Sequence, residues 1–326
     1  MRRREFMISA AAAAGVVASS KAWAQGRDDD KRARIAVMMF GLNNIVKTNM
    51  PASPTRTLEL MDIGQLCADR FRIHNVELQS NYFPSTEMSW LRDFKSRLSR
   101  SKTKVVQINL EFGVGLNLAA DTPSGRLQMI DLHRVWLDKA AFLDCPRVLL
   151  NQGQPSEENK ALLISNYRAV AEIAKSKGIN VASENRNAPG AGRGAGRGSG
   201  APGAAAQPGG QAAPPPPAPP AAPAAPAVAG PPSYLILTEI LKTAGASTCA
   251  DFLNFPTQKE QLDGIRGMLP FSSGLVHAGM RYDLPAAMAV CRELNYKGLY
   301  SIKASGLPGD PLDNTQKILD GVLADM

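Results

Sequence analysis

The chain has 326 residues, a mass of 34.8 kDa and a formal net charge of +8 at pH 7. Without a 24-residue leader and a 45-residue tract of low complexity, 257 residues remain, close to the roughly 250 of a typical (β/α)8 barrel. Those two segments carry five net positive charges. The remainder, near +3, has no basic stripe interleaved with aromatic residues, so its charge gives no support to nucleic-acid binding.

The first 24 residues have the parts of a secretory signal. Arginines open the segment, an apolar run follows over residues 10–18, and residues 22–24 (AWA) supply small residues for cleavage. Residues 3–7 (RREFM) resemble the twin-arginine motif of bacterial Tat export. We therefore expect export through the Tat translocon to the periplasm or beyond. The apolar run is shorter than the ~20 residues of a spanning helix, which disfavours an uncleaved membrane anchor.

Apolar runs alternate with helical patterns over the rest of the chain. Helical spacing is clearest over residues 88–98 and over residues 165–177, where Gly178 would end the helix. Eight units of this kind predict a parallel sheet closed into a (β/α)8 TIM barrel over residues 33–326. An open doubly wound sheet is the competitor, but no GxGxxG sequence follows the first strand. The predicted strands are residues 35–40, 76–78, 105–110, 148–150, 179–182, 248–252, 275–277 and 299–302.

A low-complexity tract interrupts the barrel pattern after the fifth predicted strand. Residues 188–232 contain 16 Ala, 13 Pro and 10 Gly, which leaves almost nothing to bury. We expect a disordered insertion on a loop at the carboxyl-terminal face of the barrel, where active sites of this fold lie. A tolerated loop is favoured over a functional lid.

The four cysteines are widely spaced and form no CxxC pair. An exported protein can form disulfides, but one of this size that folds before export does not need them. We therefore expect buried thiols at Cys67, Cys145, Cys249 and Cys291.

Polar residues at the predicted strand ends are the candidates for a site, because the strand ends of a barrel converge. Glu184, Asp251 and His277 follow three consecutive strands, and their oxygen and nitrogen atoms suit Mn²⁺, Zn²⁺, Co²⁺ or Mg²⁺. Every barrel has polar strand ends, so purely structural roles are the alternative. The further strand-end candidates are Gln79, Asn109 or Glu111, Asn151 and Lys303.

Seven short segments form a recognisable series along the chain. They are Val76-Glu-Leu, Asp131-Leu-His-Arg-Val-Trp-Leu-Asp-Lys-Ala-Ala-Phe-Leu, Arg147-Val-Leu-Leu-Asn, Ala182-Ser-Glu-Asn, Cys249-Ala-Asp-Phe-Leu-Asn-Phe-Pro, Val276-His-Ala and Tyr296-Lys-Gly-Leu-Tyr-Ser-Ile. In this order and spacing they resemble the sugar phosphate isomerase/epimerase family, which has a xylose-isomerase-like barrel. The resemblance extends from about residue 35 to residue 323, apart from the tract.

The resemblance implies a site and a reaction. In the family, four strand-end residues bind one divalent metal ion, and two glutamates move the proton of a sugar carbon. Carried over, it makes Glu184, Asp251 and His277 the metal ligands and Glu184 the catalytic base. It implies isomerisation or epimerisation of a small carbohydrate by proton abstraction next to a carbonyl. The substrate-binding candidates are Asn151, Asn254, Gln79 and Glu111; Glu77 could also bind substrate, or else form a salt bridge inside the barrel.

The fourth ligand position departs from the family pattern. Lys303 stands where the family has a glutamate, Arg186 where a histidine is common, and Gly279 where a lysine is frequent. Lys303 either pairs with Glu184 or Asp251 and replaces the metal, or serves as a second catalytic acid/base beside a three-ligand metal. Both possibilities put ordinary two-base epimerisation in doubt.

Other functions stay open beside an isomerase. One is a lyase or hydratase that acts on a keto-sugar through the same kind of intermediate, and another is a degenerate barrel that binds a sugar or a partner without turnover. His74 and His133 are expected to be structural, and three histidines are too few for the trinuclear zinc site of an endonuclease-type barrel. No glycine-rich phosphate cradle follows the last two strands, so the substrate need not carry a phosphate.

Overall fold

The computed structural model describes residues 28–47, 54–113, 116–120, 122–186 and 232–326. The predicted export signal and all but the last residue of the low-complexity tract lie outside the described residues. Within these ranges, no helix combines the length and the hydrophobicity needed to cross a membrane.

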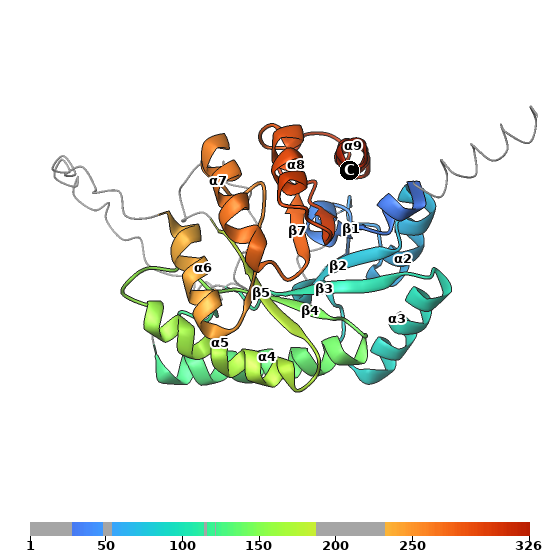
Figure 1. Cartoon of the computed structure of the whole chain (residues 1–326). Helices are drawn as coiled ribbons and strands as arrows, with labels where there is room; N and C mark the ends of the chain where they lie inside the picture. The colour runs from blue at the N-terminus through green and yellow to red at the C-terminus, as the bar shows by residue number, and fades with distance from the viewer. Residues whose placement is uncertain (1–27, 48–53, 114–115, 121, 187–231) are drawn as a thin grey trace, which may run out of the picture.

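Eight parallel strands form one sheet in the order β6-β5-β4-β3-β2-β1-β8-β7. Two isolated bridges, Thr248 to Ser272 and Asp251 to His277, join β6 to β7 and nearly close the ring. The structure is therefore the predicted TIM barrel (Figure 1). The strands are β1 (Ile35–Met38), β2 (Asn75–Gln79), β3 (Lys104–Leu110), β4 (Arg147–Leu150), β5 (Asn180–Glu184), β6 (Ser247–Cys249), β7 (Leu275–Ala278) and β8 (Leu299–Ile302).

Helices follow the strands and surround the sheet (Figure 1). They are α2 (Ile63–Leu66), α3 (Met88–Arg100), α4 (Pro123–Phe142), α5 (Lys160–Lys175), α6 (Ser233–Ala244), α7 (Gln258–Met268), α8 (Leu284–Glu293) and α9 (Pro311–Asp325). Shorter 3-10 or π turns are η1 (Met39–Leu42), η2 (Leu60–Asp62), η3 (Cys67–Phe71), η4 (Ser80–Tyr82) and η5 (Leu269–Phe271).

Local signals fix the helix ends. The side chains of Thr122, Thr257, Asp283 and Asp310 each accept a backbone N–H at the start of a helix, which satisfies donors that a helix leaves free. Gly178, with φ +69°, lies three residues after α5 ends, as its position in the sequence predicts.

Two predicted strands are shorter in the structure than the apolar runs that predicted them. The run over residues 35–40 leaves the sheet after Met38, where η1 turns the chain. The run over residues 248–252 extends beyond β6, which ends at Cys249, but it stays paired with β7. Asp251 forms an isolated bridge to His277, and the Phe252 N–H donates to the His277 carbonyl oxygen at 3.0 Å.

The interior of the barrel is built in layers. A small apolar cluster fills one layer, and it consists of Ala36, Val106, Leu149, Ala182, Cys249 and Leu275, with Leu299 packed against it. Side chains two residues further along a strand point to the same face. Glu184, Asp251 and His277 follow members of this cluster by two residues, so the alternation that fills the core also directs polar side chains to the carboxyl end of the barrel.

All four cysteines are buried free thiols, as the sequence predicts. Burial raises the pKa of the Cys67 and Cys145 thiols to about 12, so both stay protonated at neutral pH.

Candidate active site

Four polar side chains from neighbouring strands meet at the carboxyl end of the barrel. Glu184 ends β5, Asp251 follows β6, His277 lies in β7 and Lys303 follows β8. Their exposed fractions are 7%, 0%, 0% and 3%, respectively. The structure thus brings together the residues that the resemblance assigns to metal binding and the lysine that breaks the family pattern.

Glu184, Asp251 and His277 each offer one possible ligand atom, and these atoms all lie within 4.8 Å of one another. His277 Nδ1 is 3.0 Å from Glu184 Oε2 and 3.6 Å from Asp251 Oδ2. Ligands of a four-coordinate ion at bond lengths of about 2.1 Å lie roughly 3.4 Å apart, so this spacing by itself suits a metal.

Lys303 interacts with the same two carboxylates. Its Nζ donates a hydrogen bond to Asp251 Oδ2 and lies 3.5 Å from Glu184 Oε2. An ion bound through Glu184 Oε2 and Asp251 Oδ2 would therefore share both oxygen atoms with a buried ammonium group. As these side chains lie, the cluster does not fit a divalent ion beside Lys303.

A third carboxylate, that of Glu77, contacts the other ring nitrogen of His277. His277 Nε2 lies 2.8 Å from Glu77 Oε1, which also accepts hydrogen bonds from Gln107 at 3.0 Å and Asn109 at 2.7 Å. Glu77 and Gln107 are fully buried inside the barrel. The imidazole is therefore held between two carboxylates, which fixes the ring and favours its doubly protonated form.

The pKa values of these groups follow from their neighbours. Burial alone raises the pKa of Glu184, but the charge of Lys303 and the hydrogen bond from His277 outweigh it and hold that pKa well below its ordinary value. Burial lowers the pKa of His277, yet the Glu77 carboxylate helps to hold it well above its ordinary value. The cluster is thus an ionised network of carboxylates and cations.

Glu111, Asn151 and Arg186 form a separate group beside the cluster. Asn151 Nδ2 donates to Glu111 Oε2 at 2.9 Å, and the Arg186 guanidinium pairs with Glu111 Oε1. Arg186 Nε also lies 3.4 Å from Glu184 Oε1 and so connects the two groups. Asn151 and Glu111, both substrate-binding candidates, are thus hydrogen-bonded to each other.

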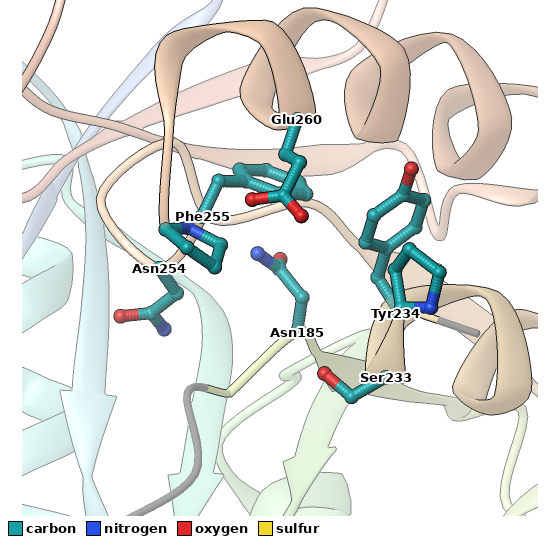
Figure 2. A pocket seen from close by; sticks show the side chains of 8 residues that line it. Asn185, Ser233, Tyr234, Asn254, Phe255 and Glu260 are labelled. Atoms are coloured by element: carbon teal, nitrogen blue, oxygen red, sulfur yellow. The ribbon is translucent and has the colours of Figure 1, made fainter. Parts of the chain in front are cut away.

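Asn254 and Asn185 flank Asp251. Asn254 Nδ2 donates to Asp251 Oδ2 at 2.9 Å, and Asn185 exchanges two hydrogen bonds with the Asp251 backbone. Both asparagines line a small pocket of about 60 Å³. Figure 2 shows the Asn185 amide and the Glu260 carboxylate on opposite sides of this pocket, with Tyr234 beside them.

Gln79 and the other two histidines lie differently. Gln79 ends β2 and is 3% exposed, so it is buried at the carboxyl end of that strand. His133 is buried in α4 with Nδ1 2.6 Å from the Met129 carbonyl oxygen, and His74 Nδ1 lies 3.0 Å from the Ser101 carbonyl oxygen. Both histidines bind backbone groups, which agrees with the structural roles expected of them.

Gly279 is explained by its neighbour. A Cβ atom at this position would lie 2.7 Å from Leu253 Cγ, so the Leu253 side chain fills the space that a longer residue would need. The departure from the family pattern at this position is therefore a packing feature of the segment after β6.

The sequence alone does not identify Glu77, Gln107 and Asn109 as the hydrogen-bonded group that holds His277. Glu77 was open to two interpretations, and of these the barrel salt bridge is the contact observed, with His277. The strand register pairs Glu77 with Gln107, and alternation along β3 places Asn109 on the same face as Gln107. A shift in the register between Val76 and Glu77 precedes this pairing.

No protein-family model and no curated protein matches this sequence. Solved structures of similar fold do exist. The D-allulose 3-epimerase from Methylomonas sp. has a TM-score of 0.61 at 13% identity, covering 90% of this chain and 98% of that chain. The xylose isomerase domain protein from Planctomyces limnophilus gives 0.57 at 12%, with 90% and 96% covered.

A third similar structure is an L-ribulose 3-epimerase, with a TM-score of 0.60 at 12% identity, covering 89% of this chain and 94% of that chain. A sugar phosphate isomerase/epimerase from Parabacteroides distasonis also matches, with a TM-score of 0.56 at 11% identity over 89% and 93% of the two chains. The chain therefore has the xylose-isomerase-like TIM barrel fold, and its structural neighbours include sugar isomerases and epimerases of that fold.

Proposed function

We propose that this chain is an exported enzyme that isomerises or epimerises a carbohydrate by proton abstraction next to a carbonyl group. The observation that carries the proposal is the buried cluster of Glu184, Asp251, His277 and Lys303 at the carboxyl end of the barrel. Structural neighbours that are 3-epimerases of allulose and ribulose support the substrate class.

Glu184 is the proposed base. Its carboxylate is ionised at neutral pH because its pKa is held low, and the Lys303 ammonium group lies beside it. In the proposed step Glu184 takes the proton from the carbon next to the carbonyl, and the electron pair of that C–H bond passes to the carbonyl oxygen. The resulting enolate needs a positive charge close to its oxygen.

Lys303 is the proposed source of that charge and of the second proton. Its ammonium group lies 3.5 Å from the Glu184 carboxylate, so a substrate that reaches Glu184 would also come close to Lys303. Return of a proton to the opposite face of the same carbon gives an epimer, whereas its delivery to the adjacent carbon gives an isomer. Asn151 and Asn254 would orient substrate hydroxyl groups.

A catalytically inactive sugar-binding barrel is the second candidate. It is favoured by the contact of Lys303 with Asp251 and by the lowered pKa of Glu184, because a carboxylate of low pKa is a weak base. A lyase or hydratase with the same enolate chemistry is the third, and it differs by releasing an elimination product.

Proton exchange in deuterated water tests the proposal. The purified protein is incubated with a panel of ketoses and keto-sugars, and the C–H signal next to the carbonyl is followed by proton NMR. We expect exchange together with formation of an epimer or isomer, and Glu184→Gln should slow both by about 10²- to 10⁴-fold. Glu157→Gln is the matched control, since Glu157 is 57% exposed and pairs with Lys160 instead of with a residue of the cluster.

The other outcomes distinguish the candidates. Sugar binding without exchange, detected by saturation transfer, identifies a binding barrel. An unsaturated product identifies a lyase. If no member of the panel binds and none exchanges its proton, the proposal is contradicted.

A further inference from the structure

We propose that the ammonium group of Lys303 is the resident cation of this site and that the protein works without a divalent metal ion. The inference goes beyond the proposed carbohydrate reaction and does not depend on it. It follows from where Lys303 lies, how deeply it is buried, and which charges surround it.

Lys303 Nζ lies against the two carboxylates that would hold the ion it replaces. Glu184 and Asp251 are two of the three residues that could ligate a metal, and the Oε2 atom of the first and the Oδ2 atom of the second both face Lys303 Nζ. The same two oxygen atoms face His277 Nδ1 at 3.0 and 3.6 Å. A divalent ion bound to these oxygen atoms would therefore share them with the ammonium group and lie close to it.

Lys303 has little room to move aside. Its side chain is 3% exposed, and Nζ lies 5.3 Å from the centre of the Phe40 ring. Its backbone N–H donates to the Ala278 carbonyl at 2.8 Å, which extends the pairing of β8 with β7 by one residue. Because β8 alternates, this register directs Lys303 into the barrel, on the same face as Ser301.

Two cations already face the carboxylates that would hold a metal ion. Lys303 Nζ pairs with Asp251 and lies 3.5 Å from Glu184 Oε2. Arg186 Nε lies 3.4 Å from Glu184 Oε1, the other oxygen atom of that carboxylate. A divalent ion would add positive charge next to both cations, and like charges at such short range repel.

Metal analysis of the full chain tests the inference. Wild-type protein is dialysed against Mn²⁺ or Zn²⁺ and analysed for bound metal, and its melting temperature is measured with and without chelator. We expect substoichiometric metal and an unchanged melting temperature. Lys303→Glu, which removes the cation and adds a carboxylate, should bind about one ion per chain, with affinity raised by at least about tenfold.

Three further variants make the result decisive. Lys297→Glu makes the same charge change at an exposed position and should behave like the wild type. Asp251→Asn introduced into the Lys303→Glu protein should remove the acquired metal. If Lys303→Glu does not fold, Lys303→Met, which removes only the charge, should still bind more metal than the wild type.

A wild-type protein that holds one ion per chain and melts earlier after chelation would overturn the inference. So would a folded Lys303→Glu protein with no gain in metal affinity. Neither result would contradict the proposed proton abstraction, which is measured separately by exchange into deuterated water.

Discussion

Individual buried groups in this protein differ in how completely they are paired. Glu184, Asp251, His277 and Lys303 all have charged partners. His133 in α4 has one backbone partner at Nδ1, and its Nε2 atom has none among the described residues. Its ring packs edge-on against Phe112 with ring centres 5.1 Å apart. Burial lowers the pKa of His133 to about 4, because a charged imidazole would lose its hydration there.

His133 should make the fold sensitive to mild acid. Between pH 6.5 and pH 4 the unfolded chain binds a proton at this residue and the folded chain does not, so stability falls as pH falls. The loss should reach about 3 kcal/mol near pH 4, which is 1.36 kcal/mol for each unit of pKa difference.

Urea unfolding of the wild type and of His133→Gln at several pH values measures this effect. The variant cannot titrate at this position, so the difference in unfolding free energy between the two proteins should change by about 3 kcal/mol from pH 7.5 to pH 4. Parallel pH profiles would show that His133 stays accessible to protons in the folded state.

At the scale of elements, the place of Lys303 depends on how η1 packs against the segment after β8. A Cβ atom on Gly41 would lie 2.7 Å from the backbone nitrogen of Ala304, the residue next to Lys303. Backbone atoms cannot turn away as a flexible side chain can. Glycine at position 41 therefore allows η1 to pack closely against Ala304, which fixes the position of the neighbouring Lys303.

Gly41→Ala should push these two segments apart. We expect a loss of about 1–3 kcal/mol in unfolding free energy, the usual cost of overpacking a well-packed site. Gly267→Ala is the matched control, because no atom lies within 4 Å of its added Cβ and it sits inside α7. That control should be neutral or stabilising by up to about 1 kcal/mol in urea unfolding. Equal changes in unfolding free energy for the two variants would mean that the backbone at Ala304 shifts at no cost to make room.

At the scale of the whole molecule, the barrel is joined in the sequence to a predicted leader at residues 1–24. We propose that this leader directs Tat export, on the strength of the arginine pair, the short apolar run and the small residues before the cleavage position. A protein that folds before export can keep buried free thiols, and the four buried free cysteines are compatible with that order of events.

Replacing Arg3 and Arg4 by lysine tests the route without changing the charge. Folded, unprocessed precursor should accumulate in the cytoplasm, as seen by fractionation and by the size of the chain on a gel. Arg2→Lys, which leaves the pair intact, should be exported like the wild type. Normal export of the double variant would indicate another route.

The sequence by itself determined the barrel and the identity of the strand-end residues. Alternation of apolar runs with helical patterns identified all eight strands to within a few residues, because burial in a two-layered α/β fold imposes a period of two on strands and of 3.6 on helices. It misjudged the end of the first strand, which leaves the sheet after Met38 where η1 turns the chain. The run over residues 248–252 continues past the regular part of β6 as an isolated bridge at Asp251.

Only the tertiary structure decided which of those residues meet and how. Position in the chain could not say whether Lys303 pairs with Asp251 or stands beside a metal, because that depends on the register of β8 against β7 and on the close packing at Gly41. Nor could it show that Glu77 supports His277 across 200 residues of sequence. Contacts of this kind are made between strands distant in sequence, and their geometry exists only once the barrel has closed.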